Sequence, residues 1–478
     1  MKRSARGLAA VLVGAIVAVT IFAAPIRAED PVVPDKSEVL KNGGLEPTQF
    51  IGPEFVLLAY TQLEENYYKS ASLHKPKLFN AALLGIAKFL KHKGIEFVPN
   101  KIEDNIGDAT AIDKFTSEYY RAAEFAKNLE WVEATDLAFY ATKYMLHSLE
   151  SSHVYFMSPE QMEERRKMLT GEALFSGIGV VIVKLGADKK TDEFEEEKED
   201  KDAFIYLAKI YPGAPADKAG FKKFDRIVEV NGAPINGTMK ELVGKIKGPK
   251  GTAVKVTVER VGERKVIEVT RDDIKPPVPE VNFYVKDGKR MMHVVLHSFE
   301  PSSLGHLKKI LIDNKYDGLV LDLRSNPGGY VGVLGAIASY FLKPETLLFT
   351  SISRGEPPRS YRTKKLSFYT RVPMIVMIDG YSASAAEIMA AAMKDHKRGL
   401  VVGDKSAGAV EVGTTLNLTH GAGIVVAISD VLSPSGARIE NAGVLPDVLL
   451  KLEDDHVKAG KDMQLDIAVG VLLDEIKK

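Results

Sequence analysis

The chain has 478 residues, of which 45% are hydrophobic and 27% charged, as is ordinary for soluble globular proteins. At roughly 150 residues per domain, this length suggests about three domains. The composition excludes a chain that is disordered throughout, a collagen-like chain and a polytopic membrane protein. The 64 basic residues balance the 64 acidic ones, so we expect no nucleic-acid partner. The absence of cysteine excludes disulfides, thiolate catalysis and cysteine-ligated metals, and we expect neither a metal nor a cofactor.

Residues 1–28 have the layout of a secretory signal. Basic residues in the first six positions precede an apolar run from Leu8 to Ala24, and small residues surround Ala28. Because this run is near the ~17-residue lower limit for spanning a bilayer, an uncleaved membrane anchor is the alternative. In both cases we expect export to the periplasm or cell envelope. Residues 29–48, rich in Pro, Gly and charge, are predicted to be a linker.

Residues 49–170 are predicted to form a helical N-terminal domain. Apolar residues recur at three- and four-residue spacing, as at Phe55, Ala59 and Leu63. The aromatic residues on these helices can pack into an internal core or against a second copy. A homo-oligomer formed through this domain is therefore an alternative to a purely internal use.

Residues 171–275 are predicted to form a β-rich domain. Four β-rich runs are separated by Gly and Pro turns, at 178–185, 203–210, 225–230 and 252–259. The charged run at 188–202 is interpreted as a solvated hairpin loop. Residues 276–279 (Pro-Pro-Val-Pro) are predicted to be a stiff linker, because proline restricts the backbone.

Residues 276–478 are predicted to form an α/β core with a mainly parallel sheet. Apolar strands are expected at 318–323, 374–378 and 400–402, and a helix at 385–393. Strands that alternate with helices indicate a parallel sheet covered by helices. The expected fold class is therefore multidomain α+β.

A strand-to-helix turn at residues 381–386 carries the most informative local chemistry. A serine there lies at the start of a helix, whose N-terminus stabilises developing negative charge. The backbone N–H of Ala385 could face an oxyanion, and a second turn containing Gly328 and Gly329 could bring another N–H alongside. The alternative for an isolated Ser-Ala-Ser motif is a simple helix cap.

Two sets of motifs resemble known families. The first set resembles a PDZ domain and consists of Gly177-Ile178-Gly179-Val180, residues 214–220 and residues 225–232. In this resemblance the first motif is the carboxylate-binding turn. The second set resembles the core of the C-terminal processing (tail-specific) serine peptidases and consists of residues 322–329, 382–388 and 434–436. This resemblance implies an endopeptidase with Ser384 as nucleophile. It also implies unfolded or tail-exposed protein substrates, bound by the C-terminus at the PDZ turn.

The sequence departs from that family at the general base. The family's lysine and the glutamine that follows it fall on Ala409 and Gly413, and neither residue can relay a proton. Lys405 occupies a neighbouring position that many members carry in addition. One interpretation is a catalytically inactive PDZ scaffold that binds peptides without turnover.

The other interpretation is a different base. A related branch, resembling the core of the tricorn protease, uses a Ser-His pair before the PDZ domain and a glutamate after the nucleophile. Ser152, His153 and Glu440 match that pattern, which implies His153 as base with Ser152 and Glu440 orienting it. Imidazole suits this task near neutral pH. His297 is a rival base, whereas His396 lies roughly 18 Å along the helix from Ser384.

Overall fold

A computed structural model describes residues 51–127, 129, 132–170, 175–185, 204–235, 239–274, 277–366 and 368–478. The predicted signal segment (1–28), the linker (29–48) and the charged run (188–202) lie outside the described residues. The described chain divides into two compact units. The larger unit comprises Glu163–Glu411 and Ser429–Lys478, and the helical unit comprises residues 51–162 and Val412–Ile428.

The helical unit is built on four α-helices: α2 (Glu54–Asn66), α3 (Lys75–His92), α4 (Asp108–Ala126) and α5 (Asp136–His147). A short 3₁₀ turn, η2 (Ser70–Ser72), joins α2 to α3. Aromatic side chains form the core of the unit, where the rings of Phe79 and Phe115 stack 4.8 Å apart and both side chains are fully buried. Among the described residues, no helix combines the length and apolarity needed to cross a membrane.

Strands also belong to the helical unit. β1 (Tyr155–Met157) pairs antiparallel with the first residues of β18 (Gly423–Leu432), and β17 (Val412–Asn417) also pairs with β18. The sequence assigned 412–428 to the α/β core, but these residues cluster with the helices. Such pairing joins segments far apart in the chain, and local patterns do not encode it.

The larger unit begins with α6 (Pro159–Thr170), which spans its boundary, and continues with the predicted β-rich region. Its main sheet has the order β3-β4-β5-β7-β8 and is antiparallel, with β6 on β5 and a separate β2–β9 pair. The four predicted runs correspond to β3 (Val180–Leu185), β4 (Phe204–Ile210), β5 (Arg226–Val230) and β7 (Ala253–Arg260). The remaining elements are β2 (Phe175–Gly177), α7 (Pro215–Ala219), β6 (Ala233–Pro234), α8 (Met239–Ile246), β8 (Glu263–Thr270) and β9 (Asp272–Ile274).

The α/β core carries a six-stranded sheet in the order β10-β11-β12-β15-β16-β19. Pairing is parallel from β11 to β19, and β10 is antiparallel to β11. The strands are β10 (Glu280–Lys286), β11 (Lys289–Val295), β12 (Gly318–Asp322), β15 (Met374–Ile378), β16 (Leu400–Gly403) and β19 (Val448–Leu449). β13 (Leu347–Ser353) pairs with β14 (Arg359–Arg362) and with the last residues of β18.

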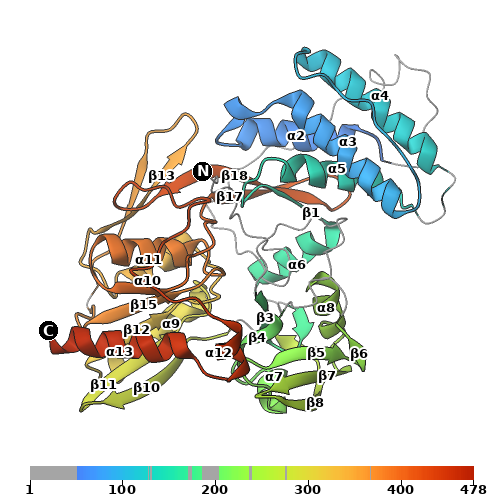
Figure 1. The fold of residues 1–478 in the computed structure, drawn as a ribbon. Coiled ribbons are helices and arrows are strands. Elements are labelled where there is room, and N and C mark those ends of the chain that lie inside the picture. Colours follow the sequence, from blue (N-terminus) through green and yellow to red (C-terminus); the bar gives the residue numbers. More distant parts are fainter. Residues whose placement is uncertain are drawn as a thin grey trace, which may run out of the picture. The chain divides into compact units, whose positions relative to one another are not determined.

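Helices cover both faces of this sheet, as expected for parallel strands. α13 (Met463–Lys477) lies on one face, and α10 (Val331–Ala338) and α11 (Ala385–Asp395) lie on the other (Figure 1). Leu472 of α13 packs on Val320 and Ile375, which are fully buried. α9 (Pro301–Asp313) and α12 (Asp454–Lys458) complete the core. Every residue of β12 and of β15 is buried, so the turns that follow these strands are held at one rigid edge.

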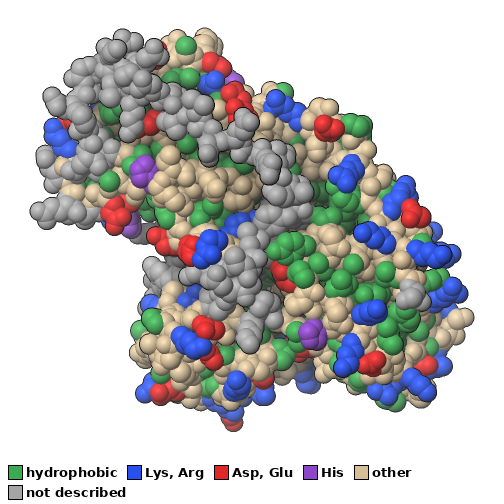
Figure 2. All heavy atoms as spheres, turned by 180° about the vertical axis from the view of Figure 1, so that it is seen from behind, with side chains coloured by type: hydrophobic (Ala, Val, Ile, Leu, Met, Phe, Trp, Pro, Cys, Tyr) green, Lys and Arg blue, Asp and Glu red, His purple; other side chains and the backbone are tan. Residues whose placement is uncertain are grey.

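The surface shows no continuous area of one charge on the face drawn in Figure 2. Lys and Arg side chains are interspersed there with acidic, apolar and uncharged ones. This distribution agrees with the formal net charge of zero.

Candidate active site

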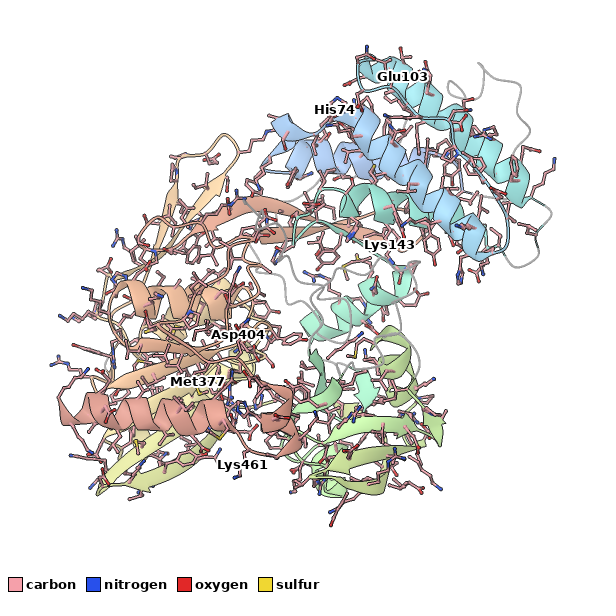
Figure 3. The ribbon with its side chains drawn as sticks, in the orientation of Figure 1. His74, Glu103, Lys143, Met377, Asp404 and Lys461 are labelled. Carbon is pink, nitrogen blue, oxygen red and sulfur yellow. The ribbon has the colours of Figure 1, made fainter. Side chains whose placement is uncertain are left out.

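Ser384 lies in a strained turn between β15 and α11. Its backbone has φ 55° and ψ −120°, a combination that residues other than glycine rarely adopt. The residue is 3% exposed, and its Oγ makes no hydrogen bond with the described residues. Met377 and Asp404, labelled in Figure 3, mark the carboxyl ends of the neighbouring strands β15 and β16. The sequence thus places Ser384 at the sheet edge where parallel strands end.

A second turn, after β12, lies directly beside Ser384. A β-carbon on Gly328 would be 2.6 Å from Ser384 Cβ and 2.9 Å from Ala385 N, so only glycine fits there. Gly328 has φ 100° and Gly329 has φ 144°, both in the region that favours glycine. Asp379 ties the two turns together, because its carboxylate accepts from the Ser325 backbone N–H (2.8 Å) and hydroxyl (3.0 Å).

The three predicted oxyanion donors differ in whether their N–H groups already donate a hydrogen bond within the protein. The Gly328 N–H donates to Asn326 Oδ1 at 2.8 Å, so that donor is already occupied. The N–H groups of Gly329 and Ala385 make no hydrogen bond with the described residues. Ala385 is the first residue of α11, where backbone N–H groups have no intrahelical partner. Two of the three groups are therefore available to a developing oxyanion.

His153 belongs to the helical unit, where it is 6% exposed. Ser152 Oγ lies 2.7 Å from His153 Nδ1, and the His153 backbone N–H donates to Ser151 Oγ at 3.3 Å. A hydrogen bond at Nδ1 helps to select the tautomer and the orientation of the ring. The predicted Ser-His pair is thus in direct contact, whereas Ser384 and Glu440 belong to the larger unit.

Two buried carboxylates, Glu387 and Glu440, accept hydrogen bonds from the segment that contains Ala409. Glu440 Oε2 accepts from the N–H groups of Val410 (2.8 Å) and Glu411 (3.2 Å). Glu387 accepts from the Ala409 N–H at 2.8 Å, and burial raises the pKa of Glu387 to about 7. Sequence reasoning assigned no role to Glu387, although its position three residues after Ser384 has the spacing of a capping box.

The rival bases have other partners. His297 Nε2 lies 2.6 Å from Glu280 Oε1, and burial lowers the pKa of His297. His396 is the C-cap of α11, at the opposite end of the helix from Ser384, and its Nε2 lies 2.7 Å from the Leu347 carbonyl oxygen. Both histidines therefore have hydrogen-bond partners other than Ser384.

The predicted peptide-binding turn joins β2 to β3. Gly179 has φ 76°, and a β-carbon there would lie 2.4 Å from the Ala214 β-carbon. The carbonyl groups of Ile178 and Gly179 accept hydrogen bonds from the backbone at 2.9 Å. The N–H groups of the same two residues make none with the described residues. They are free to hold a carboxylate.

Within the larger unit, polar contacts connect the β-rich region to the α/β core. Tyr381, three residues before Ser384, donates its hydroxyl to the Lys184 carbonyl oxygen at 3.1 Å. Asp462 bridges Lys223 (2.6 Å) and Arg324 (2.7 Å). Arg324 stands in the turn that leads to Gly328, so these contacts link the β-rich region to both turns of the site.

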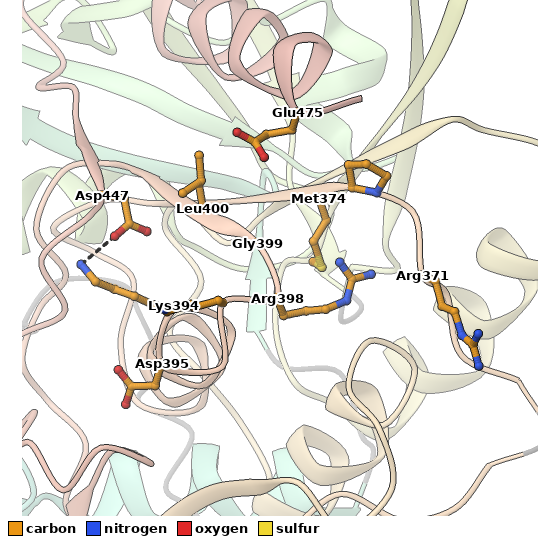
Figure 4. A pocket seen from close by; sticks show the side chains of 11 residues that line it. Arg371, Met374, Lys394, Asp395, Arg398, Gly399, Leu400, Asp447 and Glu475 are labelled. Atoms are coloured by element: carbon orange, nitrogen blue, oxygen red, sulfur yellow. Dashed lines mark ion pairs between the residues drawn. The ribbon is translucent and has the colours of Figure 1, made fainter. Parts of the chain in front are cut away.

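A depression of about 630 Å³ lies at the C-terminal end of α11 (Figure 4). Its lining mixes cations and acids, and Lys394 pairs with Asp447 at 3.1 Å. The eleven residues of α11 separate it from Ser384 by about 16 Å along the helix axis. The depression is therefore not the candidate catalytic site.

Comparison with known proteins identifies the domains. The profile of peptidase family S41 matches residues 290–450, and a PDZ domain profile matches residues 206–260. Residues 290–450 are thus similar to the peptidase domain of family S41. This stretch contains Ser384, both glycines of the adjoining turn and Glu440.

Two relatives and one solved structure illustrate the similarity. The chain is 28% identical over 331 residues to a carboxy-terminal-processing protease of Bartonella bacilliformis, covering 67% of this chain and 71% of the relative. It is 28% identical over 328 residues to a carboxyl-terminal-processing protease of Picosynechococcus sp., covering 67% and 75%. The structure of a photosystem II D1 C-terminal processing protease matches with a TM-score of 0.51 at 21% identity, over 85% of this chain and 97% of that one. It shares the fold.

These findings confirm the prediction of a serine peptidase of this type with a PDZ domain, and they do not favour the inactive scaffold. They also confirm the multidomain α+β fold class. The roles of the individual site residues stay predictions.

Proposed function

We propose that the chain is an exported serine endopeptidase that cleaves unfolded or tail-exposed proteins, with Ser384 as nucleophile and His153 as general base. The observation that carries the proposal is the position of Ser384, which follows β15 in a strained turn beside Gly328 and precedes the N-terminus of α11. A side chain at this edge, next to free backbone N–H groups, is suited to acyl transfer.

The chemistry follows from the groups named. Ser384 Oγ attacks the carbonyl carbon of the scissile peptide, and its proton passes to His153 Nε2. The oxyanion of the tetrahedral intermediate accepts hydrogen bonds from the N–H groups of Ala385 and Gly329. The intermediate collapses to an acyl-enzyme as the imidazolium protonates the leaving amine. Water then repeats the sequence and releases the second product.

His153 is proposed as the base because of its own partner. The contact of 2.7 Å between Ser152 Oγ and His153 Nδ1 supports an imidazole that presents Nε2 as proton acceptor. The proposal requires this nitrogen to approach Ser384 Oγ to ~3 Å in the substrate-bound enzyme. Glu440, pinned by the N–H groups of Val410 and Glu411, would stabilise the imidazolium.

Substrate selection is assigned to the PDZ turn. The unoccupied N–H groups of Ile178 and Gly179 would hold the terminal carboxylate of an extended peptide that adds to the sheet as a strand. The composition of residues 1–28 supports export to the periplasm or cell envelope. Sequencing the N-terminus of the protein recovered from the envelope fraction tests export and distinguishes a cleaved signal from an anchor.

A peptidase assay on a tagged peptide tests the catalytic assignment. We expect Ser384→Ala and His153→Ala to lower turnover by a similar factor, at least about 10³-fold, because members of one catalytic unit do not act additively. Lys405→Ala is the matched control for loss of a potential base and should leave turnover largely unchanged. Full activity of His153→Ala would refute the histidine assignment while leaving the serine peptidase intact.

A further inference from the structure

Four consecutive backbone N–H groups, from residues 408 to 411, donate to only two side chains. Gly408 and Ala409 donate to Glu387 at 2.6 and 2.8 Å. Val410 and Glu411 donate to Glu440 at 2.8 and 3.2 Å. Glu387 is 0% exposed and Glu440 is 2% exposed, so both carboxylates are inside the fold. This short segment is therefore the physical connection between the two carboxylates.

The same segment also holds the nucleophile turn. The Ser384 N–H donates both to the Ala409 carbonyl oxygen at 2.9 Å and to Glu387 Oε2 at 3.1 Å. Backbone in such a strained region persists only where the surroundings over-determine it. Glu387 contributes to that constraint directly, through its bond to Ser384, and indirectly, through its bond to Ala409.

We propose that Glu387 is a positioning residue of the catalytic centre, which holds the strained Ser384 turn in register with residues 408–411, the segment to which Glu440 is hydrogen-bonded. The inference rests on the proposed function, since it gives Ser384 and Glu440 the roles assigned above. Glu387 itself touches neither substrate nor the reacting atoms. It acts through the backbone of residues 408–411.

The requirement for a carboxylate follows from the donor count. Glu387 Oε1 accepts from Ser406 Oγ (2.5 Å) and the Gly408 N–H, and Oε2 accepts from the N–H groups of Ala409 and Ser384. Each oxygen therefore faces at least one backbone N–H, which can only donate. A glutamine in either orientation would direct its NH₂ group at one of them. One side of the connection would then break, although the side-chain volume is almost unchanged.

The test compares Glu387→Gln with wild type in three measurements on the full chain. We expect kcat for a tagged peptide to fall about 10- to 100-fold with KM within about twofold, as for a nucleophile misplaced by a fraction of an ångström to 1 Å. Labelling of Ser384 by a fluorophosphonate should slow by a similar factor. Amide hydrogen exchange should accelerate at Val410 and Glu411, whose direct partner is Glu440.

Glu118→Gln is the matched control. Glu118 is also a buried glutamate on a helix, is 8% exposed, and accepts hydrogen bonds from the Asn100 N–H (2.8 Å) and side-chain amide (2.7 Å) in the helical unit. The Glu118→Gln variant makes the same isosteric substitution, and we expect it to retain the wild-type kcat and the wild-type rate of Ser384 labelling. A role of Glu387 in stability alone would lower the folded fraction equally in all assays and leave kcat per folded molecule unchanged, and that result would overturn the proposal.

Two further outcomes are decisive. If Glu387→Gln does not fold, Ser406→Ala removes a single donor to Glu387 and should slow labelling about 3- to 10-fold. Wild-type labelling and exchange in that variant would overturn the proposal. If the wild type neither cleaves nor labels, the proposed function fails. The exchange measurement then decides separately, and unchanged exchange at Val410 and Glu411 in Glu387→Gln would refute the coupling.

Discussion

Replacing Gly328 with alanine tests the packing that brings the two turns together. The new β-carbon would lie 2.6 Å from Ser384 Cβ and 2.9 Å from both the Ala383 carbonyl oxygen and Ala385 N. Carbon atoms in contact prefer about 3.5–4.0 Å, so one turn must move by roughly 1 Å. The φ of 100° adds strain for any residue with a β-carbon.

A displacement of this size at the nucleophile predicts a large loss of turnover. We expect kcat of Gly328→Ala to fall about 100-fold, because a misplacement of about 1 Å can cost that factor. The assay is peptide hydrolysis at saturating substrate, with fluorophosphonate labelling of Ser384 as an independent readout. Binding of a peptide to the PDZ domain should not change.

Gly332→Ala is the matched control for this prediction. Gly332 lies in α10, four residues further along the chain, and a β-carbon there would meet no atom within 4 Å. Alanine at an exposed helical glycine should be neutral or slightly stabilising. If Gly328→Ala kept a third or more of the turnover of this control, the contact between Gly328 and Ser384 would not set the catalytic geometry.

Three other predictions concern stability and recognition. Burial raises the pKa of Glu387 from 4.5 to about 7. The folded protein therefore binds more protons than the unfolded chain between these values, and its free energy of unfolding should fall as the pH rises from 5 to 8, by roughly 2–3 kcal/mol relative to Glu387→Gln. Urea titrations of both proteins measure this, and a difference independent of pH would contradict it. Asp462→Ala should destabilise the larger unit by about 3 kcal/mol, since it removes a partner of the Arg324 guanidinium, whose side chain is 8% exposed. The exposed Asp455→Ala (92%) should cost little in the same thermal unfolding measurement. Amidating the C-terminus of a peptide should weaken its binding markedly in calorimetry, because the hydrogen bonds to the PDZ turn are charge-assisted; equal affinity would indicate recognition of internal segments.

Much of the larger unit could be predicted from short-range patterns. Apolar runs bounded by turn residues located β12, β15 and β16 to within a residue or two. A buried parallel strand is a continuous apolar run, and the sequence displays it directly. The position of Ser384 follows from the same logic, because a strand, a turn and a strong helix former stand in order along the chain.

The hydrogen bonds that connect the turns of the site could not be predicted from such patterns. The bonds of Glu387 to Gly408 and Ala409 join backbone donors to a side chain more than twenty positions away. Backbone N–H groups are identical in every residue except proline, so no residue type announces such a bond. The occupation of the Gly328 N–H by Asn326 is equally invisible, since it depends on the rotamer of one buried amide.

The sequence by itself determined the kinds of domain, the strand ends and the candidate residues Ser384, His153 and Glu440. These depend on local periodicity, on turn chemistry and on motifs with fixed spacing. The tertiary structure alone decided that Val412–Ile428 joins the helices and that two buried carboxylates connect through residues 408–411. Such arrangements arise when distant segments pack and each buried N–H must find an acceptor, a constraint that acts only once the chain has folded.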